Sequence, residues 1–148
     1  MLGILALDFW VSRDIWLESG KNTSWCLLGC SIGDLGTIYL FQVFNWGWKP
    51  ISIMALAMIN GLITSILLET FVLVTKKIRF KIALSTALGM SFLSMLAMEL
   101  AMNVTDFYLA GGSATLKLSF LPLILLAGFI TPWPYNYWRL KELNESCH

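Results

Sequence analysis

Four apolar segments, each about 20 residues long and nearly free of charge, dominate this sequence of 148 residues. A helix of about 20 apolar residues crosses the hydrocarbon of a bilayer, and a chain inside lipid must satisfy its own backbone hydrogen bonds. The segments therefore predict four membrane-spanning helices, at about residues 25–44, 51–74, 82–102 and 118–138. We expect an all-α, integral membrane four-helix bundle that leaves no room for a separate soluble enzymatic domain.

Composition and charge support this class. Hydrophobic residues make up 57% of the chain and charged residues 13%, about half the charged share of a soluble domain. The formal net charge of +1 gives no electrostatic basis for binding nucleic acid. The partners we expect are the lipid bilayer and other membrane subunits, and no nucleic acid.

The distribution of Lys and Arg predicts the orientation. The N-terminal region, the loop at residues 76–81 and the C-terminal tail together hold eight of the ten Lys and Arg residues. Only Lys49 and Lys117 fall in the loops on the opposite side. Since basic residues collect on the cytoplasmic side of a membrane, we expect both termini to be cytoplasmic.

The two ends of the chain flank the predicted transmembrane domain of residues 25–138. Residues 1–24 begin with an apolar stretch that no basic residue precedes, so we do not expect a cleaved signal. Aromatic and charged residues alternate from Phe9 to Glu18, which fits a short helix on the membrane surface or an arm that docks on a neighbouring subunit. Residues 139–148 are expected to form a cytoplasmic tail.

Polar residues inside predicted spans are candidates for a functional site, because ionisable groups at membrane depth are costly. Asp34 falls near the centre of the first span, and Asn60 falls at a matching depth in the second. Asp34 is therefore either a proton or cation site, or a packing residue that hydrogen-bonds to Asn60 or a serine.

Two glutamates lie near opposite ends of their spans. Glu69 is close to the cytoplasmic end, where it can form an interfacial ion pair with the basic loop or Arg139. Glu99 and Asn103 are four residues apart near the outer end and share one helix face.

Sulfur-bearing residues suggest a soft-metal site or ordinary core packing. Helical spacing groups five methionines into two stripes in the outer half of the bundle, Met54 with Met58, and Met95 with Met98 and Met102. Thioethers bind Cu(I), with Glu99 and Asn103 as assisting oxygen ligands, but methionine also fills gaps in apolar cores.

A second set of possible metal ligands lies at the cytoplasmic end. Cys26 and Cys30 share a helix face, and Cys147 with His148 ends the tail on the same side. The four residues fit a tetrahedral zinc or a trigonal Cu(I) site. Copper and zinc are thus the candidate metals.

Other catalytic chemistry has little basis in the sequence. His148 is the only histidine, and no phosphate-binding or dinucleotide fingerprint occurs. We therefore expect no catalytic residues and no enzymatic activity in this chain, which leaves room for membership of an enzyme complex.

Three stretches together resemble an uncharacterised family of small four-helix prokaryotic membrane proteins, a domain of unknown function. They are the Cys26–Asp34 start of the first span, the Leu93–Asn103 end of the third, and Pro134–Trp138 before the tail. The resemblance implies a prokaryotic cytoplasmic membrane. Its pattern singles out Cys26, Cys30, Asp34, Glu99, Asn103, Pro134 and Asn136, whereas members often carry a His where this chain has Trp25.

Three functions fit these observations. The first is a non-catalytic accessory subunit of a larger complex, for example a respiratory complex or a copper-dependent membrane monooxygenase. The second is a protein that binds or transports copper. The third is a small proton-coupled transporter that uses Asp34.

Overall fold

The structure, a computed structural model, describes residues 7–142, and this part of the chain is all helical with no strand. A short 3-10 helix, η2, precedes the α-helices. The elements are η2 (Leu7–Trp10), α1 (Arg13–Phe44), α2 (Pro50–Thr75), α3 (Phe80–Met90), α4 (Phe92–Leu109), α5 (Leu121–Ile130) and α6 (Trp133–Glu142).

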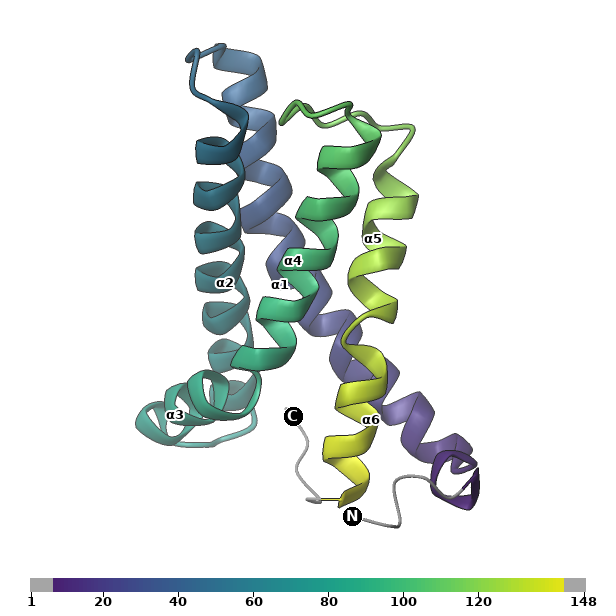
Figure 1. Ribbon diagram of the computed structural model, residues 1–148. Coiled ribbons are helices and arrows are strands. Elements are labelled where there is room, and N and C mark those ends of the chain that lie inside the picture. Colours follow the sequence, from purple (N-terminus) through teal and green to yellow (C-terminus); the bar gives the residue numbers. More distant parts are fainter. Residues whose placement is uncertain (1–6, 143–148) are drawn as a thin grey trace.

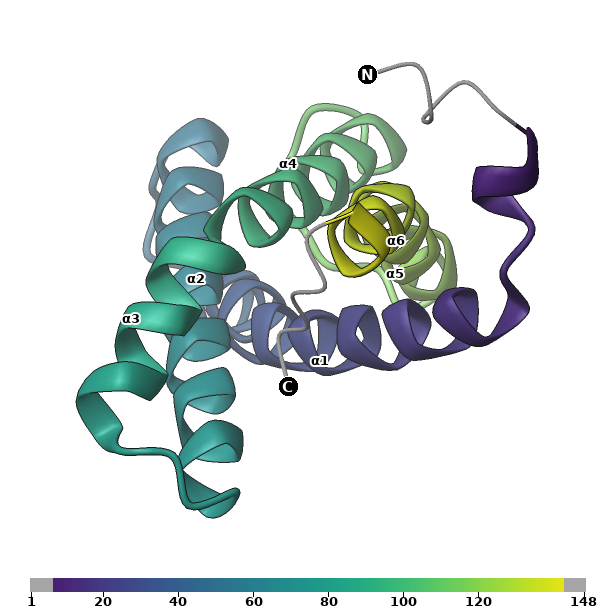
Figure 2. The ribbon, with the colours of Figure 1, turned by 90° about the horizontal axis from the view of Figure 1, so that it is seen from below.

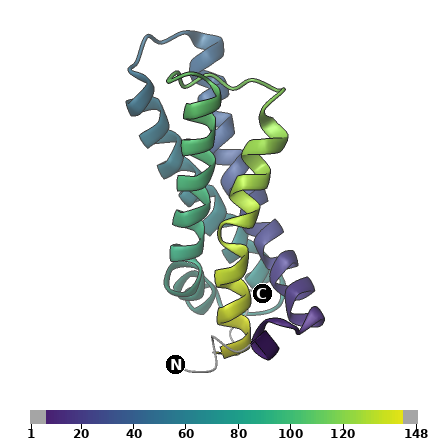
Figure 3. The ribbon, with the colours of Figure 1, turned by 45° about the vertical axis from the view of Figure 1, so that its right-hand side comes forward.

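The long helices stand side by side in an elongated bundle. Helices α1 and α2 form an antiparallel hairpin, against which α4 and the stacked α5 and α6 pack (Figure 1). Figure 3 shows α4 alongside the α5–α6 column with α1 behind them. The loop between α2 and α3 lies at the same end as η2 and α6. The loop between α1 and α2 and the loop between α4 and α5 lie at the opposite end.

The turn between α1 and α2 and the bounds of α2 closely follow the prediction from the sequence, whereas α1 begins at Arg13, well before the predicted start at residue 25. Helix α1 ends at Asn45, which adopts a left-handed conformation with φ 48° and donates its N–H to the Phe41 carbonyl oxygen. Pro50 occupies the first position of α2, where its missing N–H costs no hydrogen bond. The second predicted span, residues 51–74, is therefore confirmed as a helix with nearly the same bounds.

The third predicted segment, residues 82–102, is not one continuous helix. Helices α3 and α4 meet at a bend of 53°, and α3 lies beside the lower end of α2 in the view from below (Figure 2). Gly89 and Ser91 flank the break, and glycine–serine pairs are common sites of sharp kinks. The Ser91 Oγ donates to Glu69 of α2 at 2.7 Å, which anchors the bend.

The fourth predicted segment, residues 118–138, is also divided. Pro132 separates α5 from α6, because a proline ring cannot continue the hydrogen-bond ladder of the preceding helix. The Asn136 N–H bonds to the Pro132 carbonyl oxygen at 2.9 Å and starts the new helix. Helix α6 runs past the predicted end of the span to Glu142.

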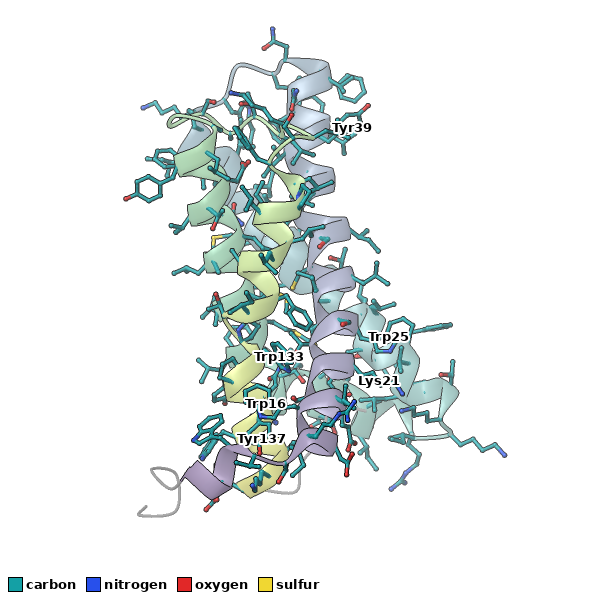
Figure 4. All side chains as sticks on the ribbon, turned by 90° about the vertical axis from the view of Figure 1, so that its right-hand side faces the viewer. Trp16, Lys21, Trp25, Tyr39, Trp133 and Tyr137 are labelled. Atoms are coloured by element: carbon teal, nitrogen blue, oxygen red, sulfur yellow. The ribbon has the colours of Figure 1, made fainter. Side chains whose placement is uncertain are left out.

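The N-terminal region is part of the longest helix and packs on the C-terminal helix of the same chain. Residues 13–24 continue α1 without a break, and η2 folds back on α6 of the same chain. The Tyr137 hydroxyl donates to the Phe9 carbonyl oxygen at 2.6 Å, and its ring stacks on Trp16 with the centroids 4.2 Å apart. Figure 4 shows Trp16, Trp133 and Tyr137 gathered at this end. A separate short helix was thus wrong for residues 13–24, whereas contact of this region with the membrane surface or with a neighbouring subunit stays a prediction, and residues 1–6 lie outside the described part.

Two helices, α1 and α2, are long and apolar enough to cross a membrane, and the bent pair α3–α4 makes a third candidate. Helix α2 also carries exposed apolar side chains on the face away from the bundle. They recur every four residues at Ile59, Ile63, Leu67 and Phe71. Such a face suits contact with lipid or with another membrane helix.

Candidate functional site

Close packing between α1 and α2 fixes the polar face of α1. Gly29 and Gly33 touch α2 so tightly that a Cβ atom on Gly29 would lie 2.6 Å from the Ser65 Cα, and one on Gly33 would lie 2.5 Å from the Asn60 carbonyl carbon. Small residues four apart permit such an approach between membrane helices. The Thr64 hydroxyl uses the short distance to donate to the Gly29 carbonyl oxygen at 2.7 Å.

Asp34, one residue beyond this contact, meets α4 in the interior. The Asn103 Nδ2 donates to the Asp34 Oδ1 at 3.0 Å and to the Glu99 carbonyl oxygen at 3.1 Å. Asn60 is not the partner, because its Nδ2 bonds to the Thr37 Oγ1 at 2.8 Å. The predicted pairing of Asp34 with Asn60 is therefore wrong, and Asn103 takes that place.

Glu99 lies one helical turn below this pair and is fully buried. Its carboxyl group occupies the space that the missing side chain of Gly61 leaves on α2, since a Cβ there would lie 2.6 Å from the Glu99 Cδ. Among residues 7–142, no N–H or O–H group donates to either Glu99 oxygen. Cys30 of α1 is also fully buried and lies one helical turn before Asp34, as Glu99 lies one turn before Asn103.

Asp106 belongs to the same polar face and was missed by the sequence analysis. It is 1% exposed, and neither carboxylate oxygen has a hydrogen-bond partner among the described residues. The prediction ended the third span at Met102, so Asp106 fell into a loop. The spacing of Glu99, Asn103 and Asp106, four and three residues, was the signal that the helix continues.

Acceptor oxygens collect on this face of α4. In the described part of the chain, five buried acceptors there lack a donor, namely Glu99 Oε1 and Oε2, Asn103 Oδ1, and Asp106 Oδ1 and Oδ2. Buried polar groups in native proteins are nearly always paired. This set of acceptors without donors makes the face of α4 the candidate functional site of the described residues.

The carboxyl groups are spread along the helix and do not converge on one point. Glu99 and Asp106 are seven residues apart on α4, about 10 Å along its axis. Within residues 7–142 no three His, Cys, Asp or Glu side chains come together as a metal site. This spacing suits groups that each bind one proton better than a site for a multivalent ion.

Glu69 sits at the end of the bundle where α3 meets α4. It is buried and accepts the hydrogen bond from Ser91 described above. The ion pair predicted from the sequence stays a prediction, and the observed contact explains why the carboxyl group is held at the bend.

Sulfur side chains form one compact cluster in the core. Five of them are buried and pack together with Ile124 of α5, namely Cys26, Cys30, Met95, Met98 and Met102. The two sets that the sequence placed at opposite ends of the bundle therefore meet. Of the predicted zinc ligands, Cys147 and His148 lie outside the described residues.

Met54 and Met58 are separate from this cluster. They are partly buried and line an apolar groove of about 470 Å³ between α2 and α4.

Two residues of the resembled pattern lie at the junction of α6 with α1. The Asn136 Nδ2 donates to the Thr23 Oγ1 at 2.8 Å in a buried contact. Pro134 is exposed in the first turn of α6, where proline is well tolerated. The Asn136 side chain thus joins α6 to α1.

The described residues form an all-α protein with two helices long and apolar enough to cross a membrane, which is consistent with a helical membrane protein. The chain belongs to the family described as "Domain of unknown function (DUF4396)", whose model matches residues 15–144. The family resemblance seen in the sequence is thus confirmed. No curated protein and no solved structure matches the chain.

Proposed function

We propose that the chain is a four-span protein of a prokaryotic cytoplasmic membrane, with both termini in the cytoplasm, that relays protons through its interior. Glu99, Asp34 and Asp106 are the proton-binding groups, and the relay serves as the coupling site of a small transporter. The observation that carries the proposal is the set of five buried acceptor oxygens without donors on α4.

The cost of burying charge supports this function. An ionised carboxylate without a partner is expensive in an apolar interior, and ionisable groups in a membrane mark ion or proton pathways. Glu99 and Asp106 are each buried without a donor in the described part of the chain. Binding a proton removes the charge and provides a donor for a neighbouring oxygen.

The arrangement of the groups supports a relay over a single binding site. The Asn103 Nδ2 bonds to the Asp34 carboxyl group and to the backbone carbonyl oxygen of Glu99, so Asn103 lies between Asp34 and the turn of α4 that carries the Glu99 carboxyl group. Protons can pass between groups that are a helical turn apart when side chains rotate or a water enters.

Proton flux into liposomes tests the proposal. The purified protein is reconstituted with a pH-sensitive dye inside, and a potassium diffusion potential drives protons inward. We expect dye acidification with the native chain and at least about tenfold slower flux with Asp34→Asn or Glu99→Gln, since general acid–base groups contribute this much or more. Asp14→Asn, at an exposed position of α1, is the matched control and should leave the flux unchanged.

Native flux no faster than in empty liposomes, or equal flux in all three variants, would overturn the proposal. In that case the second candidate gains weight.

The second candidate is a non-catalytic accessory subunit of a larger membrane complex. The exposed apolar stripe of α2 supports it, because a helix of a neighbouring subunit can pack there as well as lipid can. The measurement is the mass and composition of the particle after gentle detergent extraction of native membranes. Migration as an isolated small particle would argue against it.

A further inference from the structure

We propose that the basic loop between α2 and α3, together with the exposed side of α3, forms a binding surface for anionic phospholipids of the cytoplasmic leaflet. The basic side chains bind the phosphate of the headgroup, and the apolar side chains of α3 contact the acyl chains. The surface depends on the membrane location proposed above, and it shares no residue with the proton relay.

Helix lengths place this loop at the level of the lipid headgroups. Helix α2 has 26 residues, about 39 Å along its axis, whereas the hydrocarbon of a bilayer is about 30 Å thick. Because α2 starts at the opposite end of the bundle, its last turns extend past the hydrocarbon. The loop at residues 76–79 follows these turns and therefore lies among the headgroups.

Helix α3 is not needed to cross the hydrocarbon. Helix α4 alone has 18 residues, about 27 Å along its axis, and so covers nearly the whole of that layer. Helix α3 bends away from α4 by 53° and packs beside the lower end of α2 (Figures 1 and 2). This position at the end of the bundle suits a helix that lies in the membrane interface.

Helix α3 buries one narrow edge and leaves other apolar side chains uncovered. Ala83 and Ala87, four residues apart, are completely buried. Phe80, Ile82 and Leu88 are 62%, 48% and 49% exposed, and a groove of about 460 Å³ follows the exposed side of α3. An apolar surface with basic residues at one end fits a phospholipid, whose charge and acyl chains are likewise at opposite ends.

The charge of the loop selects the kind of lipid. Four exposed basic residues fall within six positions, namely Lys76, Lys77, Arg79 and Lys81. No Asp or Glu occurs from residue 70 to residue 98, so no carboxylate nearby in the sequence neutralises them. Clusters of about four to eight basic residues next to a membrane helix attract anionic lipids.

The backbone at Lys77 is a second, independent observation. Lys77 has φ 65°, in the left-handed region that favours glycine. The Ile78 N–H donates to the Leu73 carbonyl oxygen at 3.2 Å and the Lys77 N–H to the Val74 carbonyl oxygen at 2.9 Å. These are the two bonds of a Schellman motif, in which glycine commonly takes the position of Lys77. A lysine here strains the backbone, but it supplies a charge that glycine would not.

Native mass spectrometry of the full chain in detergent measures the lipid preference. The protein is mixed with phosphatidylglycerol or with phosphatidylcholine at equal molar ratios, and the fraction of chains that carry each lipid is compared. We expect phosphatidylglycerol to bind at least about tenfold more tightly than phosphatidylcholine. The preference should be lost in the loop variant, which combines Lys76→Gln, Lys77→Gln, Arg79→Gln and Lys81→Gln. These side chains are exposed, so the loop variant should fold.

The matched control removes the same number of positive charges at exposed positions outside the loop. It combines Arg13→Gln, Lys21→Gln, Lys49→Gln and Lys117→Gln, and it should keep the preference for phosphatidylglycerol. Equal losses in the control and in the loop variant would overturn the surface, because net charge alone would then explain the preference. Equal binding of the two lipids by the native chain would also overturn it, and would point to an acidic protein as the partner of the loop.

Lys77→Gly separates charge from stability. This variant removes one charge and relieves the strained φ, so the unfolding temperature in detergent should rise while the preference for phosphatidylglycerol falls. Lys77→Arg keeps the charge and should keep the preference. Equal preferences in Lys77→Gly and Lys77→Arg would overturn the role given to this side chain.

Proton flux distinguishes this surface from the proton relay. In liposomes of phosphatidylcholine alone, the loop variant should carry protons as the native chain does. Normal flux with equal binding of the two lipids would overturn the surface and leave the relay, whereas a lipid preference without native flux would overturn only the relay. A chain that purifies from the soluble fraction without detergent would overturn the membrane location on which the surface depends.

Discussion

Gly61 is the residue on which the position of Glu99 depends. With Gly61→Ala, the new Cβ would overlap the Glu99 carboxyl group. Overpacking of this kind costs about 1–3 kcal/mol, so we expect a lower unfolding temperature in detergent. Gly36→Ala is the control, because no atom of another helix lies within 4 Å of its Cβ position.

A double variant distinguishes this clash from a general effect on α2. In Gly61→Ala with Glu99→Ala, the two side chains no longer compete for the space, so the loss should be smaller than the sum of the single losses. Strictly additive losses would show that Glu99 does not occupy the space beside Gly61.

The contact between α1 and α2 depends on Gly33, where two helix backbones meet. Gly33→Leu places a large side chain against the Asn60 backbone, which cannot rotate away. We expect α1 and α2 to separate and the hydrogen bonds from Thr64 to Gly29 and from Asn60 to Thr37 to break. Thermal unfolding and gel filtration should show a strongly destabilised protein, whereas Gly36→Leu should remain monodisperse. Unchanged stability of Gly33→Leu would refute the close contact.

The attachment of η2 to α6 is a local contact, and we expect its loss to cost less stability than the loss of the contact between α1 and α2. Tyr137→Phe keeps the ring stacked on Trp16 but removes the hydroxyl that donates to Phe9 and accepts from the Ser12 N–H. Loss of such bonds costs about 1 kcal/mol. Hydrogen exchange at residues 9–12 should become faster, with little change in α2. Tyr108→Phe, at an exposed side chain, is the control, and equal exchange in both variants would exclude the attachment.

Across the whole molecule, periodicity and length predicted the helices but not their breaks. Hydropathy alone indicates that residues 82–102 are apolar. It contains no information on the bend that Gly89 and Ser91 permit and that the hydrogen bond from Ser91 to Glu69 stabilises. Likewise, spacing placed Glu99 and Asn103 on one face, but the choice of Asn103 over Asn60 as the partner of Asp34 depends on the parallel register of α1 and α4. Tertiary register is a long-range property that a pattern within one helix does not contain.

The positions of the loops and of the basic residues in the bundle predict its orientation in the membrane. The loop at residues 76–79 lies at the end of the bundle that also holds η2 and α6, and the loop that contains Gly111 lies at the opposite end. Because eight of the ten Lys and Arg residues belong to the end that holds η2 and α6, we expect that end to be cytoplasmic.

In a Cys147→Ser background, Gly111→Cys should react with a membrane-impermeant maleimide in intact bacterial cells, and Lys77→Cys should react only after permeabilisation. Cys26 and Cys30 are buried and serve as the unreactive baseline. Labelling of Lys77→Cys in intact cells, with Gly111→Cys protected, would reverse the orientation and place the methionine-lined groove of α2 and α4 on the cytoplasmic side.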